Sequence, residues 1–160
     1  MKYKNELERL LEISVARVHK EGHAYIRKMD KGLRPYKNRT GAYLSDGSLR
    51  RCVYPPYVGA IKGGQMIVFD IVAAKGQAVK RSTLSLEQIE ALEGYRNMGA
   101  KAYIFISFGD GRKFYRVPVR VWKKLRECSS RTLIMMKDIS EFEVKFCNGT
   151  YDFFSGLLEG

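Results

Sequence analysis

A single carboxylate, Asp70, interrupts an otherwise apolar stretch of the sequence from Met66 to Val72. The other residues of this stretch are apolar on both alternations, which predicts a β-strand covered on both faces. A carboxylate in such a strand is unfavourable unless it meets a cation, a metal ion or several hydrogen-bond donors. Asp70 is therefore either half of an ion pair with a Lys or Arg, or a ligand of a metal ion.

Glu8 is a second carboxylate beside an apolar surface. It lies in a helix predicted from about Tyr3 to Lys20, next to Leu7 and one turn before Leu11. This position places it either at the edge of a cleft or among the solvated carboxylates of the helix.

The elements that position Asp70 can be read from the residues around it. Tyr57 to Val72 predicts two strands joined at Gly63-Gly64, because this turn needs a positive φ that glycine adopts without strain. A helix follows, opened by the capping box Ser85 to Gln88 and ended at Gly99. The apolar run Ala102 to Phe108 completes a strand, helix, strand unit, so the strands at Met66 and Ala102 should be parallel.

The remaining segments complete one α/β domain over residues 1–160, without a linker, repeat or low-complexity tract. A short strand is predicted over 23–28 and a short helix over 120–126. The tail over 137–160 is predicted to form a strand and a final helical turn.

The formal net charge is +12, which favours binding to polyanions, above all nucleic acid. A segment from Ile26 to Val53 has eight basic and two acidic residues, a net of +6 and half of the total excess. Tyrosines among these cations suit contacts with phosphates and stacking on exposed bases, although a merely solvated loop has the same composition. The cations expected to bind DNA here are Lys31, Arg34, Lys37, Arg39, Arg50 and Arg51.

Several segments together resemble the RecU type of Holliday junction resolvase, phage-borne relatives included, within the PD-(D/E)xK nuclease superfamily. Their order and spacing carry the resemblance, because no single motif is decisive. The resemblance implies a restriction-endonuclease-like core with a mixed central sheet flanked by helices. The similar segments are Leu7-Glu8, Tyr57-x-Gly59-x-x-Lys62-Gly63-Gly64, Phe69-Asp70, Gln88, Gly99 to Phe108, Tyr115 to Pro118 with Trp122, and Asp152 to Leu157.

The departures from this family pattern fall on its chemistry. The resemblance implies that a first-strand Asp, a Glu and a Lys two residues apart, and the helix Glu bind magnesium and activate water. In this sequence the first Asp position is Pro56, the Glu position is Asp70 and the Lys position is Val72. Glu8 and Asp70 remain as ligands for Mg²⁺ or Mn²⁺.

Two further residues bear on this chemistry. Lys75 is placed to swing back and replace the missing ammonium group. Gln88 either caps its helix or joins the site, as the family geometry implies. In the same resemblance, Lys62 in the hairpin belongs with the DNA-binding residues.

Three functions fit these residues. The first is recognition of branched DNA in recombination and repair, with hydrolysis weakened or lost. The second is an active, metal-dependent endodeoxyribonuclease that uses Glu8, Asp70 and Lys75, and the third is a recombination-linked protein-interaction module without catalysis. The family analogy implies a homodimer on two-fold symmetric four-way junctions. The charged amino terminus predicts a cytoplasmic protein, and no apolar segment predicts a membrane anchor.

Overall fold

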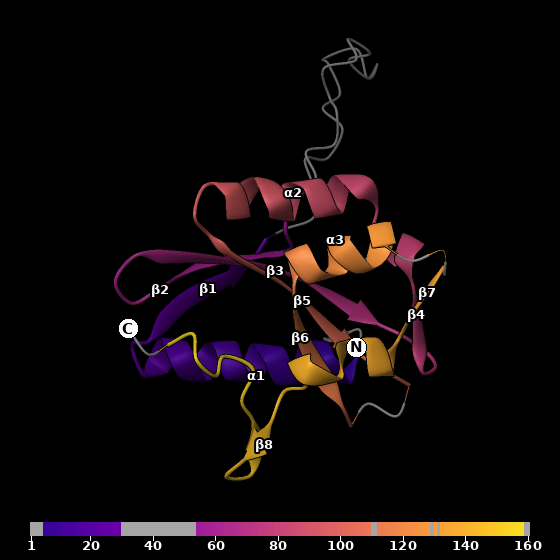
Figure 1. The fold of residues 1–160 in the computed structure, drawn as a ribbon. Helices are drawn as coiled ribbons and strands as arrows, with labels where there is room; N and C mark the ends of the chain where they lie inside the picture. Colours follow the sequence, from indigo (N-terminus) through magenta and orange to yellow (C-terminus); the bar gives the residue numbers. More distant parts are fainter. Residues whose placement is uncertain (1–4, 30–53, 110–111, 129, 131, 159–160) are drawn as a thin grey trace, which may run out of the picture.

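A five-stranded mixed sheet forms the centre of the computed structural model, which describes residues 5–29, 54–109, 112–128, 130 and 132–158. The strand order is β1-β2-β3-β5-β6, in which β3 and β5 are parallel and the other neighbours are antiparallel (Figure 1). The strands are β1 (Ala24–Lys28), β2 (Tyr57–Ile61), β3 (Gln65–Ala73), β5 (Lys101–Ser107) and β6 (Phe114–Pro118). The predicted parallel pair and the mixed central sheet are thus confirmed. The basic segment predicted at about 30–53 lies outside the described residues.

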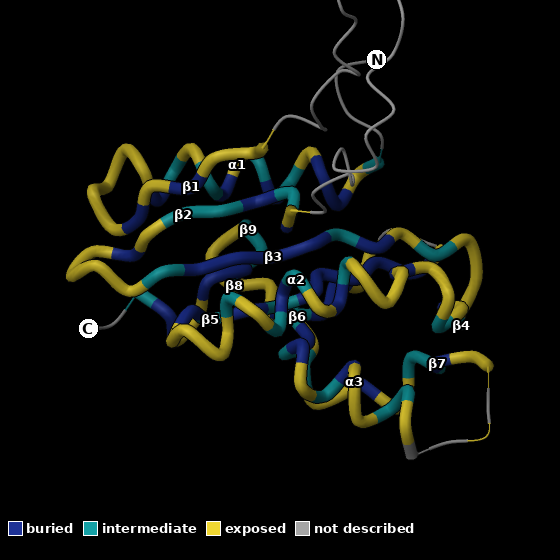
Figure 2. The backbone as a smooth tube through the Cα atoms, turned by 90° about the horizontal axis from the view of Figure 1, so that it is seen from above, coloured by how far each residue is buried: buried dark blue, intermediate teal, exposed yellow. Residues whose placement is uncertain are grey.

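Helices cover both faces of the sheet. Helix α1 (Glu6–Lys20) lies on one face, and helices α2 (Leu86–Asn97) and α3 (Val119–Cys128) lie on the other. Phe69 of β3 packs with Leu11 of α1 and Phe154 of the C-terminal segment, whereas Val72 packs with Trp122 of α3. In Figure 2, β3 runs between α1 and α2 and is dark blue along most of its length. The prediction that this strand is covered on both faces is confirmed.

Short sequence signals set the ends of these elements. Gly63 and Gly64 have φ values of 99° and 92°, and the Gly64 N–H donates to the Ile61 carbonyl at 2.9 Å, which closes the hairpin. Ser85 and Gln88 form the predicted capping box at the start of α2. Gly99, with a φ of 95°, follows the end of that helix. The backbone that positions Asp70 is therefore fixed at both ends by local interactions.

Three small elements lie at one end of the sheet. Strands β4 (Ala78–Lys80) and β7 (Leu133–Met135) pair antiparallel, and a 3₁₀ turn, η1 (Arg81–Thr83), follows β4. These strands were not predicted, because three residues carry too little periodicity to be recognised. Figure 1 shows this pair beside the end of α3.

The tail forms more elements than were predicted. It forms a 3₁₀ helix, η2 (Met136–Phe142), then strands β8 (Phe146–Cys147) and β9 (Thr150–Tyr151), and ends in hydrogen-bonded turns. The predicted strand is present as the β8–β9 pair, and residues 153–157 form a turn in which the Leu157 N–H donates to the Phe154 carbonyl at 3.0 Å, with Phe153 and Phe154 buried against the sheet. No described helix has the length and apolar content needed to span a membrane.

Gly59 shows why a motif residue must be small. It pairs with Ile26 across the β1–β2 ladder, and a Cβ atom there would lie 2.3 Å from the Tyr25 carbonyl oxygen. By contrast, a Cβ at Gly94 in α2 would meet no atom within 4 Å. Gly59 is therefore required by the close approach of two strands.

We predict opposite effects of alanine at these two glycines. Gly59→Ala should lower the free energy of unfolding by about 2 kcal/mol or more, because backbone must shift to admit the methyl group. Gly94→Ala should raise it by about 0.5 to 1 kcal/mol, because alanine favours a helix interior. Urea unfolding of the two variants measures both values, and an unchanged stability for Gly59→Ala would contradict the steric argument.

Candidate nuclease site

Asp70 lies just beyond the point where the pairing of β2 with β3 ends, while β3 continues to pair with β5. Strand β2 begins at Tyr57, which pairs with Phe69, so Asp70 is the first residue of β3 beyond the β2 ladder. Its side chain is buried, with 7% of the residue exposed. The carboxylate accepts a hydrogen bond from the Ile71 backbone N–H at 2.7 Å, and Gln88 Nε2 approaches its Oδ2 atom at 3.5 Å. Asp70 therefore has donors from its own strand and from α2.

Gln88 combines the two roles that the sequence left open. Its Oε1 atom accepts a hydrogen bond from the Ser85 N–H at 2.9 Å, and its own N–H donates to Ser85 Oγ at 3.1 Å. Its Nε2 group faces Asp70 at the same time. The amide has separate donor and acceptor atoms, so capping and contact with Asp70 do not exclude one another. Its part in any reaction remains a prediction.

Glu8 is held by a lysine from the edge of the sheet. The Asn5 side chain accepts a hydrogen bond from the Glu8 N–H at 2.8 Å, which fixes the first turn of α1. The Glu8 side chain is 6% exposed and makes an ion pair with Lys28 at the end of β1, and Lys28 Nζ is also 3.8 Å from Glu12 Oε1. Lys28 is not among the predicted site residues, because the pairing of β1 cannot be read from the sequence.

Tyr57 adds a buried hydroxyl to this group. Its ring stacks on Phe69 with ring centroids 4.7 Å apart, and Lys28 Nζ lies 6.0 Å from the Tyr57 centroid. Burial, followed by the negative charges of Glu12 and Glu8, raises the pKa of Tyr57 well above its usual value. Tyr57 is therefore a neutral phenol at physiological pH, and no well-aligned hydrogen-bond partner reaches its hydroxyl within the described part of the chain.

The other predicted residues have different positions. Lys75 is exposed on the turn after β3, where the Gly109 N–H donates to the Gly76 carbonyl at 3.1 Å. Whether its ammonium group acts at Asp70 stays a prediction. Lys62 is exposed in the β2–β3 turn, and its N–H donates to the His23 carbonyl at 2.8 Å. The six cations predicted over 31–51 lie outside the described residues.

Comparisons with known proteins identify the family of this chain. The family model described as recombination protein U, RecU, matches residues 4–152. The chain belongs to the RecU family. Among curated proteins, none matches this sequence. One similar solved structure is Hjc of Archaeoglobus fulgidus, a Holliday junction resolvase from an archaeal hyperthermophile, which is 17% identical, with 83% of this chain and 91% of that chain covered and a TM-score of 0.49.

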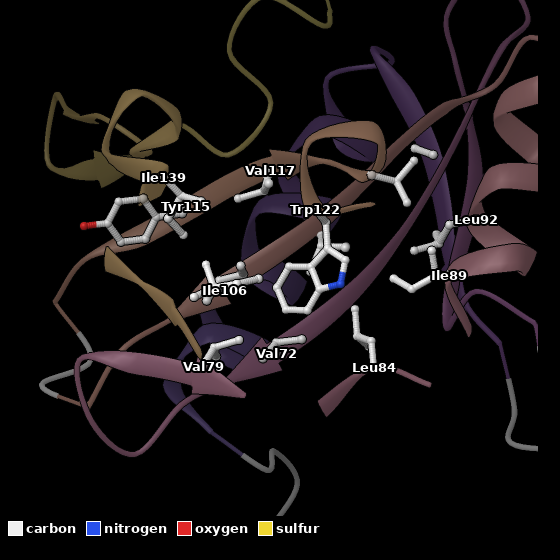
Figure 3. Close-up of a cluster of buried hydrophobic side chains, with 14 of the residues drawn as sticks. Val72, Val79, Leu84, Ile89, Leu92, Ile106, Tyr115, Val117, Trp122 and Ile139 are labelled. Atoms are coloured by element: carbon white, nitrogen blue, oxygen red, sulfur yellow. The ribbon is translucent and has the colours of Figure 1, made fainter. Parts of the chain in front are cut away.

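Pro56 and Val72 stand where the resemblance to the RecU family implies an Asp and a Lys. Pro56 directly precedes β2, so the antiparallel register places it opposite Asp70, and its carbonyl accepts a hydrogen bond from the Met29 N–H at 2.7 Å. Val72 is 2% exposed and lies among apolar side chains that include Val79 and Trp122 (Figure 3). The two positions where the resemblance implies an Asp and a Lys thus carry side chains without charge.

The side chains present do not fit a complete magnesium site. Carboxylate oxygens suit this ion, but the two carboxylates have different partners. Glu8 of α1 is paired with Lys28 of β1, whereas Asp70 of β3 is approached by Gln88 of α2. Within the described ranges, no three His, Cys, Asp or Glu side chains gather closely enough to hold a metal ion.

We predict that Lys28 stabilises the fold through Glu8. Lys28→Met should lower the free energy of unfolding by about 1 to 2 kcal/mol, because a buried carboxylate loses its ammonium partner while the lysine end of the pair is half exposed. Lys20→Met at the end of α1 is the control, since Lys20 is exposed and has no ion pair in the described structure. Equal losses in the two variants, measured by urea unfolding, would contradict this role.

Proposed function

We propose that this RecU-family chain recognises branched DNA, including four-way junctions, in recombination and repair, and that its metal-dependent phosphodiester hydrolysis is weakened or lost. The observation that carries the second half is the burial of Val72 in an apolar cluster at the position of the expected lysine. A valine neither donates a hydrogen bond nor carries charge, so it gives no help to a nucleophile or a developing negative charge.

The charge of the chain supports the first half of the proposal. A net charge of +12 over 160 residues draws polyanions to the surface before any specific contact forms. The family match supports a junction as the preferred form of DNA. The proposal includes a homodimer, because a two-fold symmetric junction is matched by a two-fold symmetric protein. It also includes action in the cytoplasm.

We predict tight junction binding that does not depend on a divalent cation. A labelled four-way junction and a linear duplex of equal length are incubated with magnesium, manganese or chelator, and binding and nicking are read from the same samples. The junction should bind more tightly than the duplex in all three conditions. Cleavage should be absent, or slower by about 10²-fold or more than in a RecU-family protein that has the Asp and Lys expected at positions 56 and 72. This factor is the typical effect of losing one acid-base group.

Two outcomes of this assay separate the halves of the proposal. Equal binding of the junction and the duplex would overturn the preference for branched DNA. Metal-dependent nicking of the junction at a rate typical of a complete site would overturn the loss of hydrolysis.

A working endodeoxyribonuclease is the second candidate, favoured by the position of Asp70. This carboxylate is buried where the β2–β3 pairing ends and is approached by Gln88, and this environment supports a role for it in a site. In that candidate Glu8 and Asp70 would have to approach one another to hold Mg²⁺ or Mn²⁺, and Lys75 would supply the ammonium group.

We predict that Asp70→Asn leaves junction affinity unchanged or slightly higher, because it removes one negative charge and keeps the side-chain shape. Glu90→Gln on the exposed side of α2 removes the same charge away from the site and is the matched control. If the wild-type protein nicks junctions, loss of nicking in Asp70→Asn alone assigns the chemistry to this carboxylate. Weaker binding by Asp70→Asn, with the control unchanged, would contradict our prediction.

A further inference from the structure

Helix α3 presents a row of cations on the side opposite its packing face. Val119 and Trp122 are fully buried against the sheet. Arg120, Lys123 and Lys124 are all exposed, and spacings of three and four residues place them on one side of the helix. These three residues are called the α3 ridge below.

The charge of the α3 ridge is not neutralised within the described part of the chain. None of its three cations has an ion-pair partner there, and Glu127, exposed one turn beyond Lys123, is the one acidic residue of the helix. Like charges one helical turn apart repel each other, and the single charge of Glu127 offsets only part of this repulsion, so a further anion beside the ridge would stabilise it.

A neighbouring helix on the same face has the opposite composition. Helix α2 contains three glutamates and one arginine, and Arg96 is paired with Glu93 at 3.1 Å. The two helices lie side by side above the sheet in Figure 1. A polyanion that approaches this face is therefore repelled from α2 and attracted to α3.

Further cations lie at the carboxyl end of the α3 ridge. Arg81 Nη1 donates to the Arg126 carbonyl at 2.8 Å, which places a guanidinium at the end of α3. Arg126 Nη1 is buried, and no described residue supplies it with a hydrogen-bond acceptor. Arg126 adds to the positive field of the ridge, because no described carboxylate pairs with it.

We propose that the α3 ridge binds the sugar-phosphate backbone of one DNA arm, in addition to any contact made by the cations predicted over 31–51. The ridge offers charge without an exposed aromatic ring, since Trp122 is buried, and this suits phosphates rather than bases. The contact is therefore independent of DNA sequence. This inference rests on the proposed function, because it takes DNA to be the ligand.

Charge-matched variants test the ridge. Lys123→Gln/Lys124→Gln removes two ridge charges, and Lys20→Gln/Lys145→Gln removes two exposed charges from α1 and the tail. Affinity for a four-way junction and for a linear duplex is measured for each protein over a series of salt concentrations. The slope of log affinity against log salt should become shallower by about 1.8 in the ridge variant, about 0.9 for each phosphate that the protein no longer neutralises, and should change little in the control.

Each result has a distinct meaning. An unchanged slope in the ridge variant, or the same change in both variants, overturns the ridge as a DNA-binding surface, and so does a wild-type protein that binds no DNA. A shallower slope in the ridge variant alone supports it, even if the wild-type protein binds the junction and duplex equally and the proposed preference for branched DNA fails. Thermal melting of all three proteins establishes that the substitutions leave the fold intact.

Discussion

The burial of β3 on both faces is the constraint on which the arrangement of the site depends. A strand enclosed in this way tolerates a carboxylate only where donors reach it, and Asp70 meets this condition at the point where β2 has ended. The Ile71 N–H and the Gln88 amide both approach the carboxylate. Because Gln88 also caps α2, one side chain contributes both to the start of that helix and to the environment of Asp70.

The same constraint explains what has replaced the expected lysine. Asp70 and Val72 point to the same side of β3, but Val72 is enclosed by the α2 and α3 layer, where an unpaired ammonium group is strongly disfavoured. Valine fills that space with a side chain that needs no partner. Among the described residues, Lys28 of β1 makes an ion pair with Glu8 of α1, the helix on the face opposite α2 and α3. Glu8 and Asp70 are both buried carboxylates, and each has its own described partners, Lys28 for Glu8 and Gln88 with the Ile71 N–H for Asp70.

Much of the fold follows from local sequence signals, whereas the site does not. The Gly63-Gly64 turn, the Ser85 to Gln88 capping box and the apolar run Ala102 to Phe108 are each encoded within a few residues, and together they predict the parallel pair of β3 and β5. The contact between Lys28 and Glu8 joins residues 20 positions apart and depends on how β1 pairs with β2, so no local pattern reveals it. Strands β4 and β7 fall outside the prediction for a similar reason, since each acquires its shape from its partner.

The distribution of charge connects these observations to function. A chain with a net charge of +12 gains little specificity from the excess itself, since any polyanion is attracted to it. Specificity needs the charge to be placed unevenly, and α2 and α3 provide such a contrast on one face of the sheet. Because Gln88 of α2 also reaches Asp70, the acidic helix lies next to the point where the β2–β3 pairing ends, and the basic helix lies beside α2. A polyanion attracted to α3 would be repelled by the glutamates of α2, so the contrast between the two helices would orient it on this face of the sheet.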